Sequence, residues 1–474
     1  MSSPEAAQSG YVPATAAPPL PTGPTRGAPP AESAQAAGRR LARLVALSVA
    51  IGPLAAAVLA LGVVAGAPEH ELIGCGLLGL ALGWAALALA SSTLTDRPQR
   101  WAAVPAAALG AIGAALLVLA PGDRALTAAG WVWPPLLLAL TTWTAARAAR
   151  SLHPRVSFWL LSPALVLLLL ASVGGGAATL RTALAGDAPA MPGELYDVGD
   201  HRLHLFCTGT GGPTVVLLGG LGETSAAWGL VQPAIAGTTR VCSYDRAGQA
   251  WSDSAPGPKD GVQVAADLHA LLDRAGEPGP HVLAGHSVGG SYAMVYAAQY
   301  PDDVAGLVLL DSASPFQFTA LPDYPGAYSS MRRAAALLPT LVRLGAGPLL
   351  DSGVPADLPS ADQARLQAFA WGTRQLRAER DEVAAYPELF DQAQALTGVG
   401  SAPVVVVTAT AGDRQAGWAD AQAALAELSP ISSHRLVPAT HTSLLLDAAD
   451  SDRSVAAIED VVQAARSSSA VSEP

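Results

Sequence analysis

Two patterns of apolar residues divide this chain of 474 residues. Between residues 39 and 178, long apolar stretches are separated by short charged loops, and most are close to the ~20 residues that a helix needs to cross a bilayer. These stretches are residues 44–66, 72–94, 102–120, 130–146 and 157–176. From residue 193 to residue 470, shorter apolar runs alternate with amphipathic segments, which is typical of a mostly parallel sheet covered by helices. The sequence therefore predicts an α-helical transmembrane bundle of about five spans followed by an α/β domain.

Two segments of the chain lack the large apolar side chains of a folded core. Residues 1–38 are mostly Ala, Pro, Ser and Gly, and we expect a disordered tail because such a segment cannot offset the entropy of ordering. Residues 179–192 are predicted to be a linker between the bundle and the α/β domain. A secretory signal peptide is not expected, because the first apolar run starts only after Arg39, Arg40 and Arg43 and is too long.

Arginines are distributed unevenly between the loops of the bundle. They precede the first apolar stretch and occur in the second and fourth loops, whereas the loops at residues 67–71 and 121–125 contain one arginine between them. By the positive-inside rule the N-terminus is cytoplasmic, and an odd number of spans places the α/β domain outside the cytoplasm. The fourth stretch is the weakest span, because it is short and contains Pro134 and Pro135. We expect a multi-pass protein of the cell membrane whose bundle acts as an anchor, since no charged residue lies near the middle of a span.

The α/β domain is predicted to begin with a hairpin that turns at Gly199-Asp200. The predicted strands are residues 195–198, 202–206, 213–218, 239–244, 282–285, 305–310, 403–408 and 433–438, and residues 263–274 form an amphipathic helix. About 90 residues, 312–402, interrupt this alternation with Pro-rich loops and helices. An insertion of this kind is typical of a lid, and its aromatic residues are candidates to line an acyl pocket.

One strand-to-helix junction carries a candidate nucleophile. It reads Gly285-His286-Ser287-Val288-Gly289, with an apolar strand before it and a helical pattern after it. Glycines on both sides of the serine are needed because the strained turn leaves no room for neighbouring Cβ atoms. The bare Gly-x-Ser-x-Gly pattern is weak in a glycine-rich chain, but its position between a strand and a helix makes it specific. We therefore predict a nucleophile elbow with Ser287 as the nucleophile.

The order of the motifs resembles the α/β-hydrolase superfamily. A predicted strand ends in Gly-Gly-Leu-Gly at 219–222, the next is followed by Tyr-Asp-Arg-Ala-Gly at 244–248, and the elbow reads Gly-His-Ser-Val-Gly-Gly at 285–290. The resemblance covers about residues 193–467 and implies an eight-stranded sheet with chain order serine, acid, histidine. Many relatives carry His-Gly where this chain has Gly219-Gly220. This departure does little harm, because the oxyanion hole there uses backbone N–H groups.

The resemblance also indicates the remaining site residues. The backbone N–H groups of Leu221 and Val288 are the expected oxyanion-hole donors. Asp413 follows the strand at 403–408, where the family usually keeps its acid, and is the first choice. Asp311, directly after the preceding strand, is the alternative acid, because some relatives hold the acid there; otherwise both aspartates are helix caps or turn formers. His441, after the last strand, is the predicted base.

Three further residues near these motifs receive other interpretations. His434 starts a strand and is expected at the surface, and His286 is expected to pack against the sheet. Glu223, close to the oxyanion loop, is interpreted mainly as a solvated loop carboxylate, with substrate selection as the alternative.

The three cysteines fall in two different settings. Cys75 lies inside the second apolar stretch and is expected to serve packing. Cys207 and Cys242 lie on strands that are antiparallel neighbours in the strand order of the resembled family. We therefore expect a Cys207–Cys242 disulfide, which an extracytoplasmic location would allow, with two buried reduced thiols as the alternative.

Composition and motifs exclude several other functions. The net charge of −11 and the absence of a basic stretch in the C-terminal half argue against a nucleic-acid partner. We find no phosphate-binding loop, zinc spacing, calcium loop or dinucleotide fingerprint, so no metal or cofactor is expected. The favoured function is a membrane-anchored serine hydrolase of carboxylic esters, with lipid-like esters suggested by the location. The alternatives are an acyltransferase on the same scaffold and a non-catalytic sensor or binding protein.

Overall fold

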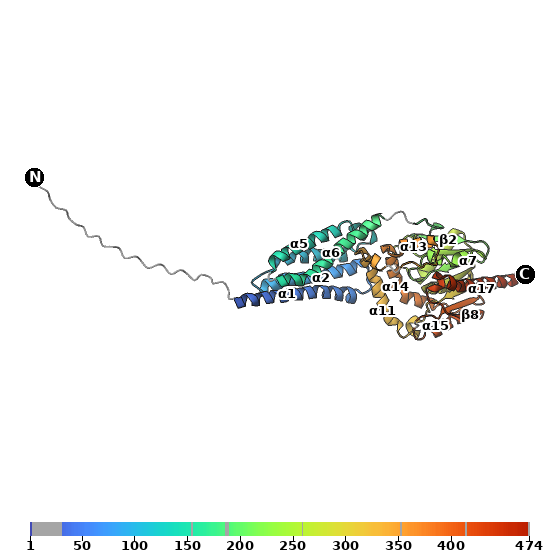
Figure 1. Cartoon of the computed structure of the whole chain (residues 1–474). Helices are drawn as coiled ribbons and strands as arrows, with labels where there is room; N and C mark the ends of the chain where they lie inside the picture. The colour runs from blue at the N-terminus through green and yellow to red at the C-terminus, as the bar shows by residue number, and fades with distance from the viewer. Residues whose placement is uncertain are drawn as a thin grey trace.

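The computed structural model describes residue 1 and residues 31–472, except residues 153–154, 185–188, 258, 351–352 and 413–414. Figure 1 shows a bundle of long helices with the strand-containing domain at one of its ends. Most of the predicted tail, residues 2–30, lies outside the described residues. The division into a helical bundle and an α/β domain is the one that the apolar pattern predicts.

The bundle contains helices long and apolar enough to cross a membrane. Its elements are α1 (Ala31–Ala57), the π-helix η1 (Val58–Val63), α2 (Glu69–Leu94), η2 (Arg100–Ala102), α3 (Ala103–Leu119), α4 (Asp123–Ala129), α5 (Trp133–Ser151) and α6 (Arg155–Leu184). Four helical segments are long and apolar enough to cross a membrane. The pair α4 and α5, bent by 48°, makes a fifth if it counts as one span. The bend coincides with the predicted weak span. Pro134 and Pro135 lie in the first turn of α5, where proline is tolerated.

Two predicted boundaries of the bundle differ from the structure. Helix α1 begins at Ala31, inside the predicted tail, because residues 31–38 include four alanines, the residue with the highest helix propensity. Helix α6 continues to Leu184, inside the predicted linker. The glycines of α6 serve close packing rather than ending the helix, since a Cβ at Gly175 would lie 2.1 Å from the Trp133 ring.

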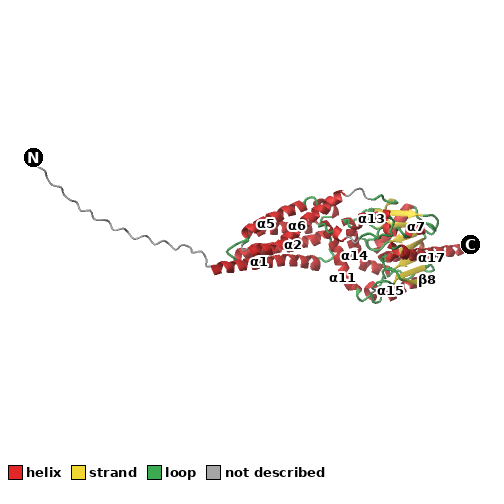
Figure 2. Ribbon diagram, in the orientation of Figure 1, coloured by secondary structure: helices red, strands yellow, loops and turns green. Residues whose placement is uncertain are grey.

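The C-terminal domain contains one eight-stranded sheet, drawn yellow in Figure 2, in the order β1-β2-β4-β3-β5-β6-β7-β8. The strands are β1 (Glu194–Asp197), β2 (Arg202–Thr208), β3 (Val215–Leu218), β4 (Val241–Asp245), β5 (His281–His286), β6 (Val304–Leu310), β7 (Val404–Ala409) and β8 (Ser432–Val437). The predicted hairpin is confirmed, because β1 and β2 pair antiparallel with Asp197 opposite Arg202. Strand β2 pairs antiparallel with β4, and the other neighbours are parallel.

Helices cover both faces of this sheet and bury its central strands. The helices outside the lid are η3 (Ser225–Trp228), α7 (Val231–Ile235), α8 (Gly261–Ala275), α9 (Val288–Gln299), η4 (Pro301–Asp303), α15 (Trp418–Leu425), η5 (Ala426–Leu428), α16 (Ser443–Leu446) and α17 (Ala448–Ser472). One hydrophobic core lies between the sheet and α8 and α9, and the other between the sheet and α7 and α17. The parallel strands are continuous apolar runs because both of their faces are buried.

The insertion between β6 and β7 forms a helical lid that lies between the sheet and the bundle (Figure 1). It consists of α10 (Gln317–Ala320), α11 (Tyr324–Arg343), α12 (Gly347–Leu350), α13 (Ser360–Ala370) and α14 (Thr373–Ala393). The ring of Phe318 packs edge-on against Tyr324 and Tyr328, with centroids 5.0 and 5.1 Å apart. These lid aromatics therefore pack on each other.

Candidate active site

Ser287 occupies a strained turn between β5 and α9. Its φ of 55° lies in a region that only glycine adopts without strain. The turn is anchored to the end of β6, because the Ser287 N–H donates to the Leu310 carbonyl (3.1 Å) and the Ser287 carbonyl accepts from the Ala313 N–H (2.9 Å). The predicted elbow is thus present as a local structure.

The glycines of the elbow are required by close backbone contacts. A Cβ at Gly285 would lie 2.5 Å from the Gly290 Cα, and a Cβ at Gly289 would lie 2.1 Å from the Leu218 carbonyl oxygen. Contacts this short do not occur for real side chains, so the turn can pass over the end of β3 only with glycine at these positions. Steric contacts therefore explain why both positions that flank the predicted nucleophile are glycine.

His441 is hydrogen-bonded to the buried carboxylate of Asp311. The distance from His441 Nδ1 to Asp311 Oδ2 is 2.6 Å, and the Asp311 side chain is fully buried. The other oxygen, Oδ1, accepts a hydrogen bond from the Ala409 N–H (3.1 Å). Because Nδ1–H donates to Asp311, the Nε2 atom of His441 is left as a proton acceptor.

The structure describes only one of the two predicted acids. Asp413, the first choice, lies outside the described residues. Asp311, the alternative, is the aspartate that the structure brings to His441. Strand β6, which precedes Asp311, pairs with β7, so the two strand ends are neighbours at the same edge of the sheet.

The loop of residues 219–222, here called the oxyanion loop after its predicted role, lies against Ser287. A Cβ at Gly220 would lie 2.9 Å from the Ser287 Cβ. The backbone hydrogen bonds between described residues do not use the N–H groups of Leu221 or Val288 as donors. The N–H groups of both predicted oxyanion-hole donors therefore have no backbone acceptor among the described residues.

Comparison with known proteins supports the fold of this domain. Residues 213–447 match the family model described as alpha/beta hydrolase fold. The C-terminal domain belongs to the α/β-hydrolase superfamily. The protein named Probable transporter efuK of Hormonema carpetanum is 33% identical over 136 residues, which are 27% of this chain and 20% of that protein. Lipase LipV of Mycobacterium tuberculosis is 61% identical over 46 residues, which are 10% of this chain and 17% of that lipase.

The chain thus spans a fifth or less of the length of these two curated relatives. Among solved structures, a thermophilic esterase from Thermogutta terrifontis with malate bound is 25% identical, with a TM-score of 0.45 over 56% of this chain and 94% of that chain.

The oxyanion loop of this α/β-hydrolase is held by side chains on two sides. Arg246 donates to the carbonyl oxygens of Gly219 and Gly220, both at 2.6 Å, and is paired with Glu382 of lid helix α14 at 2.8 Å. On the other side, the Gly220 N–H donates to Glu223 Oε2 at 2.5 Å. The loop conformation therefore depends on the lid as well as on the sheet.

Glu223 is not a solvated loop carboxylate, and that interpretation is wrong. Its side chain is 17% exposed and pairs with fully buried His286, with Nδ1 at 2.8 Å from Oε1 and 3.0 Å from Oε2. Burial by itself raises the pKa of Glu223, but the adjacent His286 outweighs this and lowers the pKa below its usual value. The pair links residues far apart in the chain, so no local pattern could have indicated it.

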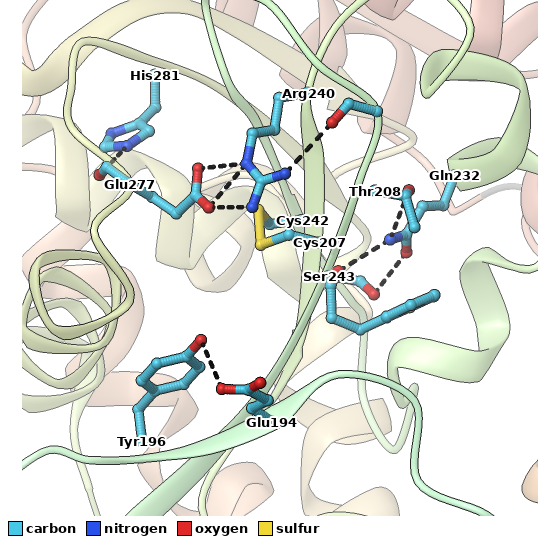
Figure 3. Close-up of a disulfide and its surroundings, with 12 residues drawn as sticks. Glu194, Tyr196, Cys207, Thr208, Gln232, Arg240, Cys242, Ser243, Glu277 and His281 are labelled. Atoms are coloured by element: carbon cyan, nitrogen blue, oxygen red, sulfur yellow. Dashed lines mark hydrogen bonds and ion pairs between the residues drawn. A yellow bond between two sulfur atoms is a disulfide. The ribbon is translucent and has the colours of Figure 1, made fainter.

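The expected disulfide is present. Cys207 on β2 and Cys242 on β4 are direct partners in the antiparallel register, and their sulfur atoms are bonded. Figure 3 shows the Arg240 guanidinium paired with Glu277 beside this bond, at 2.5 Å between Nη2 and Oε1. Within the described ranges, these two cysteines and Glu277 are the potential metal ligands that lie near one another. With the sulfurs bonded to each other and Glu277 paired with arginine, the group is not available to a metal.

Proposed function

We propose that this protein is a membrane-anchored serine hydrolase that cleaves carboxylic esters through an acyl-enzyme on Ser287. The observation that carries the proposal is a strained serine whose chain neighbour, His286, lies against His441, with ring centroids 4.5 Å apart, while Nδ1 of His441 is hydrogen-bonded to buried Asp311. Family membership of the domain and the match to a protein named a lipase support the reaction class. The order Ser287, Asp311, His441 keeps the order of nucleophile, acid and base that the superfamily uses.

In the proposed reaction, Ser287 Oγ attacks the ester carbonyl while Nε2 of His441 takes the hydroxyl proton. Asp311 holds the imidazole in the tautomer with Nδ1–H and stabilises the cation that forms. The N–H groups of Leu221 and Val288 bind the oxyanion, each contributing about 3 kcal/mol to transition-state stabilisation. His441 then protonates the leaving alkoxide, and water hydrolyses the acyl-enzyme by the same route.

The proposed location is the outer face of the cell membrane, with the N-terminus in the cytoplasm. The lid contacts the bundle at Glu69 and Asp123, which belong to the two loops that are poor in positive charge. The α/β domain therefore sits at the bundle end that the positive-inside rule places outside. An enzyme held at this surface is next to lipid esters, and we propose lipid-like esters as the preferred class within the small-molecule esters.

Active-site labelling tests the proposal. The full-length protein in detergent should react with a fluorophosphonate, and Ser287→Ala should abolish both labelling and release of p-nitrophenol from p-nitrophenyl esters. Ser329→Ala, an exposed serine that bonds within its own lid helix, is the matched control and should label normally. Labelling that persists in Ser287→Ala contradicts the proposed nucleophile. A burst that turns over only after an alcohol is added would indicate an acyltransferase, and a wild-type protein that does not label would indicate a binding protein.

A further inference from the structure

His286, the residue before the nucleophile, lies between two hydrogen-bond acceptors. Its Nδ1 faces the Glu223 carboxylate at 2.8 Å, and its Nε2 lies 2.9 Å from the backbone carbonyl oxygen of His441. The rings of His286 and His441 also lie next to each other, with centroids 4.5 Å apart. A carbonyl oxygen can only accept, so Nε2 carries a proton, and a carboxylate likewise favours a proton on Nδ1.

The charges around His286 favour the imidazolium form. Burial alone lowers the pKa of His286, but Glu223, the hydrogen bond to His441 and the charge of Asp311 together raise it above the usual value. Glu223 also accepts a hydrogen bond from the Gly220 N–H, and the charge of His441 stabilises its carboxylate form. Glu223 and His286 are thus a buried ion pair with no net charge.

This ion pair is bonded to two loops of the site. Through Glu223 Oε2 it holds the Gly220 N–H, which precedes the oxyanion donor Leu221. Through His286 Nε2 it holds the backbone of His441, the proposed base. A shift of either loop by about 1 Å would cost on the order of 100-fold in rate, because the reacting groups must be aligned.

The charge of the pair also affects the reaction. The site of a Cβ on Gly220 is 2.9 Å from the Ser287 Cβ and 3.1 Å from Glu223 Oε2, so these two atoms are within about 6 Å of each other. A carboxylate this close to the forming oxyanion opposes the reaction unless a cation neutralises it. His286 is the cation bonded to it.

We propose that Glu223 and His286 are a positioning pair for the hydrolase reaction: together they align the oxyanion loop with the base loop, and His286 neutralises the Glu223 charge next to the oxyanion. This inference rests on the proposed function of Ser287. It predicts that removing His286 alone lowers the rate more than removing both members of the ion pair.

The test compares His286→Gln, Glu223→Gln and the double variant in the full-length protein. Fluorophosphonate labelling rates and p-nitrophenyl ester kinetics per labelled site are measured between pH 5 and 9. His286→Gln should lower the labelling rate and kcat by about 100-fold with little change in KM. Glu223→Gln should lose about tenfold or less, and the double variant should be at least about tenfold faster than His286→Gln.

His204→Gln is the matched control. His204 is also fully buried between a carboxylate, Asp245 at 2.8 Å, and a backbone carbonyl, that of Pro192, but on strand β2. This variant should lower the melting temperature while leaving the rate per labelled site within about twofold of wild type. If His286→Gln does not fold, Glu223→Ala replaces it and should be at least about tenfold slower than Glu223→Gln.

Three outcomes overturn the inference. One is a His286→Gln rate within about twofold of wild type, and another is a double variant no faster than His286→Gln. Equal rates for Glu223→Ala and Glu223→Gln also contradict it. In each case a labelled wild type leaves the proposed function intact, whereas a wild type that does not label removes the proposed function and this inference together.

Discussion

Arg343, the last residue of lid helix α11, forms an ion pair with Glu69, the first residue of bundle helix α2, with 2.8 Å between Nε and Oε1. Arg377 of α14 approaches the same carboxylate at 3.7 Å, and both arginines also pair with Asp123 at 2.5 and 3.2 Å. Helix α14 in addition donates from Gln375 to the Gly222 carbonyl (3.1 Å) in the oxyanion loop. One lid helix therefore contacts both the bundle and the oxyanion loop, so the bundle supports the lid.

Replacing Glu69 should loosen the lid. The Glu69 side chain is 1% exposed, so Glu69→Gln leaves two arginines facing Asp123 alone. Breaking a fully buried pair costs about 3–5 kcal/mol, and we expect about 2 kcal/mol here because the arginines are partly exposed. Limited proteolysis of the protein in nanodiscs should show faster cleavage within the lid. Glu71→Gln, whose carboxylate is 40% exposed, is the control and should be cleaved at the wild-type rate; equal rates for both variants would contradict a clamping role.

Replacing each candidate acid by asparagine should show which one assists His441. Asp311→Asn removes the acceptor for His441 Nδ1–H and favours the wrong tautomer, so kcat should fall by about 10⁴-fold. Asp413→Asn should change kcat by less than about tenfold. Steady-state kinetics on a p-nitrophenyl ester measure both, with labelled sites used to normalise the enzyme concentration. The opposite ranking would return the role of acid to Asp413.

The candidate nucleophile and the candidate base could be located from the sequence because local context marks each of them. Ser287 lies between a strand and a helix, and His441 lies between the last strand and the last helix. The acid is different, because Asp311 and the region of Asp413 follow strands β6 and β7, which are neighbours. The ends of β6 and β7 lie at the same edge of the sheet, so the position of an aspartate after a strand does not by itself indicate which one meets the histidine. Asp311 makes the turn after β6 with a φ of 43°, which no pattern of apolar residues indicates.

Long-range ion pairs were beyond sequence reasoning for a related reason. Glu223 and His286 are 63 positions apart and meet because β3 pairs with β5. Glu69 and Arg343 are 274 positions apart and meet because the lid packs on the bundle. A carboxylate in a glycine-rich loop has the same sequence pattern whether it is solvated or buried, so the environment of Glu223 required the packed structure.

A partly buried carboxyl on the lid should make stability depend on pH. Burial raises the pKa of Glu379 to about 7, although Gln375 donates a hydrogen bond to it. As pH rises from about 4.5 to 7 the unfolded chain ionises first, so the folded state loses about 3 kcal/mol of relative stability. Glu379→Gln should therefore raise the melting temperature relative to wild type at pH 8 and change it little at pH 4.5. A stabilisation that is equal at both pH values would contradict this assignment.

The disulfide should stabilise the hydrolase domain. It joins residues 35 positions apart, and a loop of this length contributes about 2–4 kcal/mol. A Cys207→Ala/Cys242→Ala double variant should lose that amount in denaturant unfolding, whereas Cys75→Ala, in the bundle, should leave the unfolding of this domain unchanged. Peptide mapping without reduction should recover Cys207 and Cys242 as one linked pair. Two alkylatable thiols at these positions in protein from its native membrane would contradict the bond.

The orientation in the membrane can be tested with reporters that are active only in the cytoplasm. The loop after the second span contains Arg97 and Arg100, and the positive-inside rule places it in the cytoplasm. Because five spans put the α/β domain on the opposite side, a reporter fused after Pro474 should be silent and one fused after Asp96 should be active. Activity at both sites would mean an even number of spans. The pair α4 and α5, bent by 48°, would then enter and leave the membrane on the same side, and the disulfide would face a reducing compartment.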